Sequence, residues 1–485
     1  MDIVGTEAAD TLSGTADADQ VAALAGGDVV HGFAGDDGLD GGSGDDQLFG
    51  DDGADDLYGG NGRDILQGGA GDDQLYGGDG SDTLAGGAGA DLIYGGDGID
   101  AVDYSANSGA IAVDGGRVTG GGDAGGDVLN GIESVIGTAF ADALRFTGAS
   151  VLDGRAGNDS LSGGDTLLGG DGNDQLSDGR TLRGGAGDDV LTGLAGNAGN
   201  LLYGDGGNDT LNGLAAVIDG GAGLDTYKAS LTDGGVNLAM GYVSFGNTTG
   251  AISGVENVTV AGEHVRVVGS VGANVIDGAA LTGDNMLIGG AGDDTITGGG
   301  LVCRFSGGTG ADHFSLKASY NYLYYDTSSA GVDIDLAARH FSGGDAEGDS
   351  IALTGTPRLG VIGSAFADTI RASDTVTFGL DADNLVSGGG GDDRLIAGGA
   401  RDALVGGSGA DVFVYESTSD IGYFDDRITD FSSAQGDKID LHDISGELSW
   451  YTSGAAMIVR IYVDRGYHYI QLDNVIQLSL SDFIL

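Results

Sequence analysis

The sequence predicts an all-β fold, a parallel solenoid closed at its C-terminal end by an antiparallel β cap. Three observations favour this fold class. The 485 residues include 101 glycines and one proline, a composition that excludes collagen and conventional helical proteins. A nine-residue pattern repeats without a gap from Gly32 to Asp103. Apolar and polar residues alternate along the chain after Ile444, as they do in antiparallel hairpins.

The charge of the chain excludes several classes of partner. The formal net charge is −56 at pH 7, so we expect no binding to nucleic acid, which requires many lysines and arginines. All but seven of the 75 acidic residues are aspartates. Glutamate depletion argues against a halophilic acidic surface, and the 40% hydrophobic content argues against a disordered chain. Short carboxylates beside tight turns favour the ligation of a hard cation such as calcium.

Targeting signals and cysteines indicate whether the protein spans a membrane, how it is exported and whether disulfides brace it. No apolar run approaches the roughly 18 residues of a spanning helix, so we expect no membrane span. The start of the chain, Met1 to Glu7, has neither the basic nor the apolar region of a signal peptide, and we expect export without a cleaved N-terminal signal. Cys303 is the single cysteine, so no internal disulfide braces the fold.

The nine-residue repeat explains the glycines and the aspartates together. Eight contiguous copies run from Gly32 to Asp103, and three degenerate copies extend the register back to Gly5. Glycines at positions one, two and four allow a tight turn, and position six supplies a carboxylate. Position eight supplies one inward aliphatic side chain per copy: Leu39, Leu48, Leu57, Leu66, Leu75, Leu84, Ile93 and Val102.

One aliphatic residue is too small a core for a lone copy, so the copies must stack, two to an 18-residue coil. Aspartates on the same edge are then 18 residues apart and lie at the strand spacing of about 4.8 Å. An unneutralised column of carboxylates repels itself, whereas a divalent cation between neighbouring turns makes the column cohesive.

The pattern G-G-x-G-x-D-x-U-x resembles the calcium-binding repeat of the RTX (repeats-in-toxin) family. This resemblance implies a parallel β-roll/β-helix solenoid with calcium, the expected cofactor, shared between adjacent turns. The candidate ligands are the position-six aspartates: Asp28, Asp37, Asp46, Asp55, Asp64, Asp73, Asp82, Asp91, Asp100, Asp159, Asp174, Asp189, Asp209, Asp225, Asp294, Asp312, Asp393, Asp402 and Asp411. For the degenerate turns at Asp10 and Asp19, a carboxylate that only faces water is an open alternative.

The repeats divide the chain into alternating arrays and spacers. We expect repeat arrays at 5–103, 154–228, 269–315 and 379–414, β-helical spacers at 104–153, 229–268 and 316–378, and a C-terminal cap with a secretion signal at 415–485. The spacers lack the repeat glycines and are interpreted as wider coils without calcium loops, with an independent globular insert as the alternative.

The second array is expected to bind calcium along one edge. Its complete turns alternate with hexads such as Gly163 to Leu168, which lack three loop residues, so a coil should be about 15 residues long and all complete turns should share an edge. Asn274, Asn285 and Asn384 offer an oxygen without a charge and predict weaker sites. Cys303 is a poor partner for a hard cation.

The sequence pattern at the end of the chain differs from the repeats. The run from Phe424 to Ile444 resembles the C-terminal region of serralysin-type secreted proteins, and the apolar stretches after it predict hairpins, one turning at 464–466. The final residues 482–485 resemble the ending of type I secretion substrates. We expect them to lie beyond the solenoid, which needs a lid over its last coil.

Catalytic motifs are missing from the sequence. It contains neither H-E-x-x-H nor G-x-S-x-G, its six histidines are dispersed, and the repeat accounts for its paired carboxylates. Tyr320, Tyr322 and Tyr324 share one strand face, and we expect them to be buried, the alternative being exposed rings that stack on sugars or on a neighbouring molecule.

These observations predict a secreted, calcium-folded structural or adhesive protein and no enzyme. Its expected location is a cell surface, a surface layer or an extracellular matrix. Expected partners are calcium, the type I secretion machinery, and either further copies in a lattice or filament or a cell-surface polysaccharide. The alternative is a polysaccharide-active enzyme or a glycan-binding module built on a solenoid.

Overall fold

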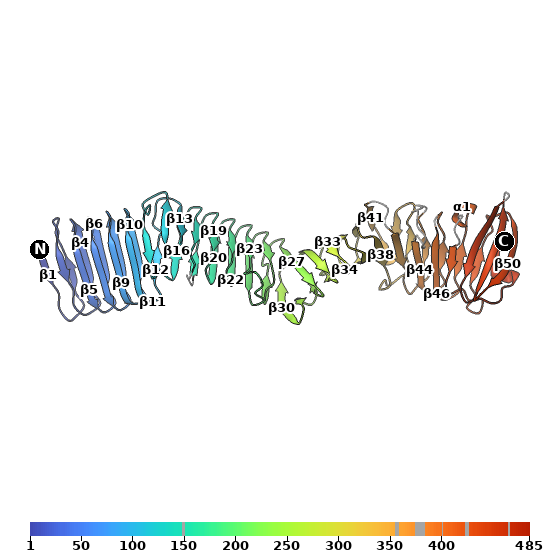
Figure 1. The fold of residues 1–485 in the computed structure, drawn as a ribbon, viewed down its shortest axis with the longest axis horizontal. Coiled ribbons are helices and arrows are strands. Elements are labelled where there is room, and N and C mark those ends of the chain that lie inside the picture. Colours follow the sequence, from blue (N-terminus) through green and yellow to red (C-terminus); the bar gives the residue numbers. More distant parts are fainter. Residues whose placement is uncertain (148–150, 355–357, 374–383, 400, 422–425, 464–465) are drawn as a thin grey trace. The chain divides into compact units, whose positions relative to one another are not determined.

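The computed structural model describes residues 1–147, 151–354, 358–373, 384–399, 401–421, 426–463 and 466–485. Two compact units make up the chain, one of residues 1–228 with 250–255 and the other of residues 229–249 with 256–485. Short β-strands dominate both units (Figure 1). The predicted all-β solenoid is therefore confirmed.

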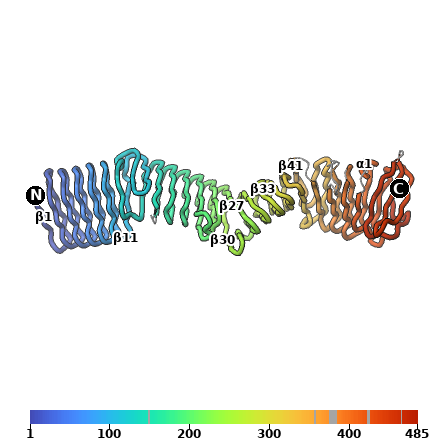
Figure 2. Tube along the Cα trace, in the orientation of Figure 1, coloured from blue at the N-terminus to red at the C-terminus, as the bar shows by residue number. Residues whose placement is uncertain are grey.

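The first array of unit 1 forms one strand per nine-residue repeat. Consecutive strands alternate between two parallel sheets, so β5 pairs with β7 and β6 pairs with β8. Leu39 is in register with Leu57, which gives the 18-residue coil, and the successive coils can be followed in Figure 2. The strands are β1 (Asp2–Val4), β2 (Thr11–Ser13), β3 (Gln20–Ala22), β4 (Val29–Ala34), β5 (Gly38–Ser43), β6 (Gln47–Asp52), β7 (Asp56–Asn61), β8 (Ile65–Ala70), β9 (Gln74–Gly80), β10 (Thr83–Ala88), β11 (Leu92–Gly98) and β12 (Ala101–Asp103).

The core between these sheets is one aliphatic residue deep in each half-turn. The position-eight side chains from Leu39 to Val102 are all fully buried. Burial of one such side chain contributes about 2 kcal/mol, which is close to the conformational entropy lost by one or two residues. The aliphatic core alone therefore does not offset the ordering of a nine-residue turn.

The first spacer continues the solenoid and adds a hairpin to it. Strand β15 pairs in parallel with β11, and β16 pairs in parallel with β12, whereas β13 and β14 form an antiparallel hairpin. The spacer thus adds coils to unit 1. Its strands are β13 (Ile111–Asp114), β14 (Arg117–Gly120), β15 (Val128–Asn130), β16 (Ser134–Ile136), β17 (Ala143–Arg145) and β18 (Val151–Asp153).

The second array has shorter coils, as its truncated turns predict. Ser160 is in register with Gln175, and Thr166 with Thr181, so the coil there is 15 residues long. The strands are β19 (Ser160–Ser162), β20 (Thr166–Asp171), β21 (Gln175–Ser177), β22 (Thr181–Ala186), β23 (Val190–Thr192), β24 (Leu201–Gly206), β25 (Thr210–Asn212) and β26 (Val217–Asp219). Strands β27 (Thr226–Thr232) and β30 (Thr248–Ser253) each have residues in both units.

Unit 2 repeats the same construction with larger side chains in its core. Phe305, Phe314 and Phe413 take inward positions and are buried. The strands before residue 326 are β28 (Gly235–Asn237), β29 (Tyr242–Phe245), β31 (Asn257–Glu263), β32 (Arg266–Val268), β33 (Val275–Thr282), β34 (Asp284–Ala291), β35 (Thr295–Gly298), β36 (Val302–Thr309), β37 (His313–Leu316) and β38 (Tyr320–Tyr324). Those from there to residue 421, with one 3-10 helix and one short α-helix, are β39 (Asp333–Asp335), β40 (His340–Ser342), η1 (Gly344–Ala346), β41 (Ser350–Leu353), β42 (Arg358–Ile362), β43 (Thr369–Arg371), β44 (Asn384–Gly390), β45 (Arg394–Ile396), β46 (Asp402–Ser408), β47 (Val412–Val414) and α1 (Thr418–Ile421).

The tyrosines of β38 contradict the expected burial. Asn321 and Leu323 take the inward positions, so Tyr320, Tyr322 and Tyr324 lie half-buried on the outer face. The guanidinium of Arg358 lies 5.0 Å from the centre of the Tyr320 ring. The alternation of the strand was predicted correctly, but the three tyrosines take the outer face, because Asn321 and Leu323 occupy the inner one.

The C-terminal cap contains the predicted antiparallel hairpins. Strands β50, β51 and β52 form an antiparallel sheet whose last member pairs in parallel with β48. Part of the predicted 464–466 turn, residues 464–465, lies outside the described residues. The elements are β48 (Asp426–Ile428), β49 (Lys438–Asp440), β50 (Glu447–Ser453), β51 (Ala456–Val463), β52 (Gly466–Leu472), η2 (Leu480–Asp482) and β53 (Phe483–Ile484).

The end of the chain does not lie beyond the solenoid, contrary to expectation. Strand β53 pairs in parallel with β49, and the Phe483 ring stacks on Trp450 with centroids 5.3 Å apart. Phe483 supplies the buried face that closes the last coil. Among the described residues, no helix has the length and apolar character needed to cross a membrane.

Candidate metal centre

The position-six aspartates form hydrogen-bonded ladders along the edges of the solenoid. Oδ1 of each aspartate accepts a hydrogen bond from the backbone N–H of the aspartate one coil earlier, as in Asp37 to Asp55 at 2.8 Å and Asp55 to Asp73 at 2.8 Å. The second edge repeats this in Asp46 to Asp64 at 2.8 Å. One carboxylate oxygen of each residue is therefore fixed by the backbone.

The other carboxylate oxygen is buried without a hydrogen-bond partner. This holds for Oδ2 of Asp28, Asp37, Asp46, Asp55, Asp64, Asp73, Asp82, Asp91, Asp100, Asp159, Asp174, Asp189, Asp209, Asp294, Asp312, Asp393 and Asp411. A buried acceptor left unsatisfied costs about 1–3 kcal/mol, and more when it is charged. A cation beside these oxygens would supply the missing partner along the whole column.

The space beside each unpartnered oxygen is lined by oxygen atoms. A β-carbon added at position-one Gly59 would lie 2.5 Å from Oδ2 of Asp64 and 2.6 Å from the carbonyl oxygen of Gly77 in the next coil. Carboxylate and carbonyl oxygens are the donors that calcium prefers. In the part of the chain that the structure describes, no three His, Cys, Asp or Glu side chains cluster as a metal site, and the further candidate donors beside each Oδ2 are backbone carbonyl oxygens.

Position-four glycines hold the turn in the conformation that makes this space. Gly62 has φ +140°, and a β-carbon there would overlap the carbonyl oxygen of Gly44 one coil earlier. Any other residue would therefore meet both backbone strain and a steric clash. At position two the left-handed conformation is kept even without glycine, with φ 75° at Phe33 and 71° at Asp51.

Burial disfavours the charged form of the column carboxyls when no cation is present. Burial raises the pKa of Asp55 and Asp64 to about 6 and that of Asp73 to about 7, with neighbouring carboxylates adding to the rise and a backbone hydrogen bond opposing it. An ion beside Oδ2 would reverse this effect because it favours the carboxylate.

Comparison with known protein families agrees with this geometry. The family model of the RTX calcium-binding nonapeptide repeat matches residues 2–30, 13–48, 31–66, 49–84, 67–102, 146–176, 181–211 and 280–300. The chain carries RTX calcium-binding repeats. The model of the serralysin C-terminal region of M10 peptidases matches residues 362–465. A search of curated proteins found no match.

The RTX repeats bind calcium, and together with the serralysin-type region they make the chain a calcium-binding protein exported by type I secretion. The serralysin match begins at residue 362, well before the resemblance noticed at Phe424, and it includes the last RTX array. Neither matched region is a catalytic domain.

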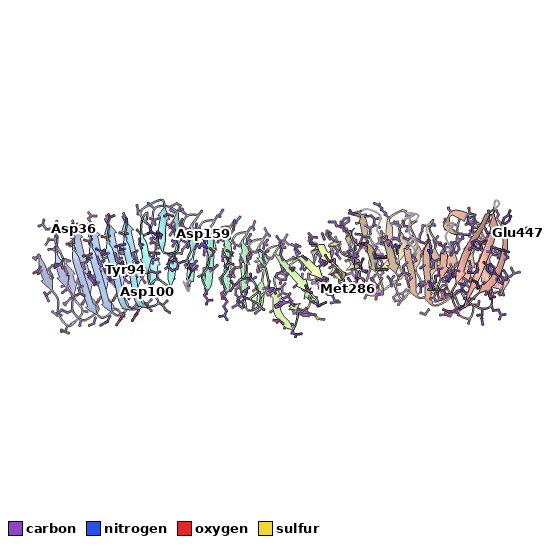
Figure 3. The ribbon with its side chains drawn as sticks, viewed as in Figure 1. Asp36, Tyr94, Asp100, Asp159, Met286 and Glu447 are labelled. Carbon is purple, nitrogen blue, oxygen red and sulfur yellow. The ribbon has the colours of Figure 1, made fainter. Side chains whose placement is uncertain are left out.

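The RTX turns of the second array lie in one column. The backbone N–H of Asp159 donates to Asp174, Asp174 to Asp189, and Asp189 to Asp209, at 2.7–2.8 Å, and Asp209 donates to Asp225 at 2.7 Å. Figure 3 places Asp159 on the same edge of unit 1 as Asp36, and Asp100 on the opposite edge. Within residues 154–228, every carboxylate oxygen that the structure describes as buried without a hydrogen-bond partner belongs to this column. One-edge calcium binding there stays a prediction.

Asp402 differs from the other predicted RTX ligands. Its Oδ2 accepts a hydrogen bond from the N–H of Gly398 at 2.8 Å, and its Oδ1 accepts one from the Asn384 amide at 2.7 Å. The asparagine positions are likewise hydrogen-bonded, since Oδ1 of Asn274 accepts from Ser270 and that of Asn285 from Val265. We therefore leave Asp402 out of the proposed ligand set.

Cys303 is buried in β36, in register with Asn285 and Asn321. Burial raises the pKa of its thiol to about 12. A neutral thiol is a weak ligand for calcium, in keeping with the expectation from the sequence.

Sequence reasoning missed residues that prolong the RTX ladders. Asp91 donates its N–H to Asp127 at 3.0 Å, and Asp312 donates to Asp349 at 2.8 Å. Asp127 and Asp349 end the two motifs that the spacers share, GGDAGGD and GGDAEGD, which was the available signal. A second ladder joins the position-five residues of neighbouring coils: the backbone N–H of Asn173 donates to Oδ1 of Asn158 at 2.9 Å. The family pattern specifies no residue at this position.

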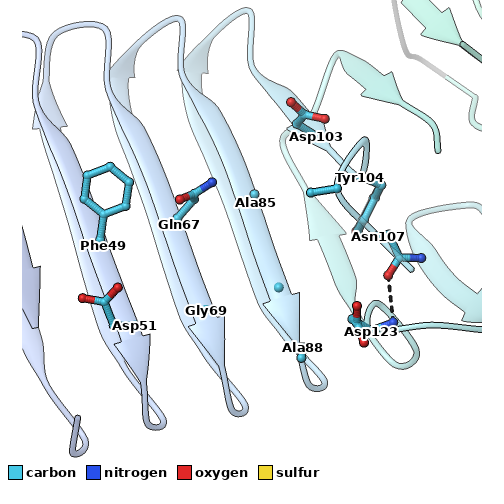
Figure 4. Close-up of a pocket in the computed structure, with 12 residues that line it drawn as sticks. Phe49, Asp51, Gln67, Gly69, Ala85, Ala88, Asp103, Tyr104, Asn107 and Asp123 are labelled. Carbon is cyan, nitrogen blue, oxygen red and sulfur yellow. Dashed lines mark hydrogen bonds between the residues drawn. The ribbon is translucent and has the colours of Figure 1, made fainter. Parts of the chain in front are cut away.

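A hollow of about 330 Å³ lies over β6, β8 and β10 of unit 1. Phe49, Gln67 and Asp103 line it, and Asn107 accepts a hydrogen bond from the N–H of Asp123 at its rim, at 2.7 Å (Figure 4). This hollow is separate from the carboxylate columns, which run along the turns.

Proposed function

We propose that this protein is a calcium-hardened structural or adhesive component of a cell surface, surface layer or extracellular matrix. One observation carries the proposal: the solenoid coils run on through the first spacer of unit 1. In unit 1, β15 and β16 pair in parallel with strands of the first array, and β17 pairs with β19 of the second. The repeats form the body of each unit, as a structural protein requires.

Calcium would be held at the unpartnered Oδ2 atoms together with the next coil's carbonyl oxygens. The proposed ligands are the predicted aspartates whose Oδ2 is described above as unpartnered, together with Asp225, which continues the column of Asp209. A dication beside each oxygen would remove the repulsion within a column whose chain carries 56 net negative charges. The ion would thereby join coils that share only one aliphatic residue per half-turn.

Electron microscopy of the purified protein with calcium and with excess chelator tests this role. Ordered arrays or filaments that need calcium support the structural role. Monodisperse particles in calcium that also fail to bind whole cells would contradict both the structural and the adhesive forms. The variant Asp73→Asn with Asp91→Asn provides a control, because it removes two neighbouring charges from one column and should weaken any calcium-dependent assembly.

A second candidate function, glycan binding, is favoured by the hollow over β6, β8 and β10. It combines an aromatic ring, Phe49, stacked on His31 with centroids 4.5 Å apart, with the amides of Gln67 and Asn107 and the carboxylate of Asp51. Flat rings and amides are the groups that recognise sugars. Loss of polysaccharide binding in Gln67→Ala, with calcium binding unchanged, would support this candidate, and no binding by the unmodified protein would exclude it.

A further inference from the structure

Some turns of the solenoid close on their position-six carboxylate without needing an ion. In the turn Gly137 to Asp142, Thr138 donates its N–H to Oδ2 of Asp142 at 2.6 Å and its hydroxyl to Oδ1 at 3.0 Å. Ser364 does the same for Asp368, at 2.6 Å from N–H to Oδ2 and 2.7 Å from hydroxyl to Oδ1. We call these hydroxyl-closed turns. The oxygen that is unpartnered in the RTX turns is satisfied here.

Two further turns share both contacts, and a third shares the N–H contact. Thr15 donates its N–H and its hydroxyl to Oδ2 of Asp19, at 2.6 and 2.9 Å, and Ser270 donates both to Oδ1 of Asn274, at 2.7 and 3.2 Å. Thr6 donates its N–H to Oδ2 of Asp10 at 2.6 Å. All five read G-[ST]-x-x-x-[DN] in the sequence, with Ser or Thr at position two, and four of them have no glycine at position four, the exception being Gly272.

The backbone differs at position two. In the RTX turns this residue has a positive φ, for example 107° at Gly60 and 71° at Asp51. Among the described residues with positive φ there is neither Thr138 nor Ser364. The altered peptide directs its N–H at the carboxylate, and a calcium ion cannot share an oxygen with a donor proton aimed at the same lone pair. These turns therefore do not fit the ion that the family implies.

Hydroxyl-closed turns stand one coil before a column of unpartnered carboxylates. The N–H of Asp142 donates to Asp159, and that of Asn274 to Asp294, both at 2.7 Å. The N–H of Asp368 donates to Asp393 at 2.9 Å. The turns of Asp10 and Asp19 precede Asp28 and Asp37 in the same way, at 2.7 Å.

A tyrosine hydroxyl closes the other end of two columns. Tyr104 donates to Oδ2 of Asp127 at 3.0 Å, and Tyr325 donates to Oδ2 of Asp349 at 2.9 Å. Both tyrosines are buried. Asp127 and Asp349 are the carboxylates that follow Asp91 and Asp312 in their ladders, so the hydroxyl lies where the RTX turns leave Oδ2 without a partner.

We propose that the hydroxyl-closed turns bind no calcium and form metal-independent ends of each calcium column. A hydroxyl and an amide N–H replace the ion there, so the first coil of a column rests on a turn whose closure does not depend on calcium. The motif G-[ST]-x-x-x-[DN] then marks where a column begins. This inference is independent of the structural or adhesive role, since it concerns only which turns take metal.

Calcium anomalous diffraction from crystals of the full chain tests the proposal directly. Peaks are expected beside Oδ2 of Asp159 and Asp174, and none beside Asp142 or Asp368. A calcium peak within about 2.6 Å of Oδ2 of Asp142, the usual calcium–oxygen distance, would overturn it.

A conversion variant tests the same point in solution. Thr138→Gly with Phe140→Gly turns Gly137 to Asp142 into the sequence G-G-A-G-A-D, and bound calcium measured by mass spectrometry should rise by one ion per chain. Thr138→Val keeps the β-branched shape without the hydroxyl and should leave the count unchanged, whereas Asp174→Asn should lower it by one. A fall in the count for Thr138→Val would show that the hydroxyl-closed turn holds an ion and would refute the proposal.

Discussion

The backbone N–H of Asp73 donates a 2.9 Å hydrogen bond to Oδ1 of Asp91, one coil further along the chain. This bond fixes the carboxylate so that its second oxygen faces the space beside Gly86, where a β-carbon would overlap it. A single side chain thus bridges two coils through one oxygen and offers the other to a cation. Because this bridge repeats from coil to coil, the hydrogen bonds that order the column also orient the oxygens proposed to bind calcium.

Asp73→Asn should weaken calcium-dependent folding. The amide keeps an oxygen but loses the charge that favours a hard cation, and about 1–3 kcal/mol of calcium-dependent stabilisation should disappear. The calcium concentration at the midpoint of the circular dichroism transition should rise. Asp72→Asn is the matched control, because Asp72 at position five accepts a hydrogen bond from Ala90 that an asparagine can also accept. An equal shift in both variants would contradict the assignment of position six.

Gly62→Ala should destabilise unit 1 by more than the usual cost of a left-handed alanine. Its φ is +140°, and the β-carbon would overlap the Gly44 carbonyl. Left-handed strain alone costs about 1 kcal/mol, which Gly196→Ala isolates, since Gly196 has φ +74° and no neighbouring atom within 4 Å. Thermal unfolding in saturating calcium checks the difference. Equal losses in the two variants would exclude the close approach of the coils.

Calcium affinity should fall as the pH is lowered through about 7 to 6, the raised pKa values of Asp73 and Asp55. These values exceed the unfolded value of about 3.9, so the calcium-free fold binds protons that the unfolded chain does not. Without calcium, these carboxyls stabilise the fold most below about pH 4, and this contribution is lost as the pH rises through 6 to 7. Calcium requires the carboxylate and therefore displaces protons.

Isothermal titration calorimetry in buffers of different ionisation enthalpy measures this proton release. At pH 6 it should be larger than at pH 8. An affinity that does not change between these pH values would show that the column carboxyls are already ionised without metal.

Removal of residues 482–485 should reduce export through a type I system and also loosen the cap. The export effect follows from the serralysin-type region, and the structural effect from the pairing of β53 with β49 and the contact of Phe483 with Trp450. The double variant Ile484→Ser, Leu485→Ser separates the two effects, because these side chains are 40% and 69% exposed. Ile476→Ser, at 81% exposure, is its control. Full export of the double variant and of the truncated chain would refute a role of the last residues in secretion.

The repeat allowed much of the fold to be predicted from the sequence, because its period fixes which side chains share a face. Leu39 and Leu57 are in register at the expected spacing, and the hexads after Gly163 give the shorter coil. The hairpin of β13 and β14 has no period and was not foreseen. Position six alone does not reveal the amide N–H of Gly398 that faces Asp402, so the sequence could not set this residue apart from the other predicted ligands.

The most direct measurement of the central claim is the circular dichroism spectrum of the full chain in excess chelator, compared with the spectrum in saturating calcium. Since each half-turn between Gly32 and Asp103 buries one aliphatic residue and leaves a buried carboxylate oxygen unpartnered, we expect calcium to supply the missing stabilisation. We expect a largely disordered spectrum in chelator that converts to β-structure when calcium is added. A chelator spectrum that already matches the calcium-loaded one would contradict the claim that calcium holds the coils together.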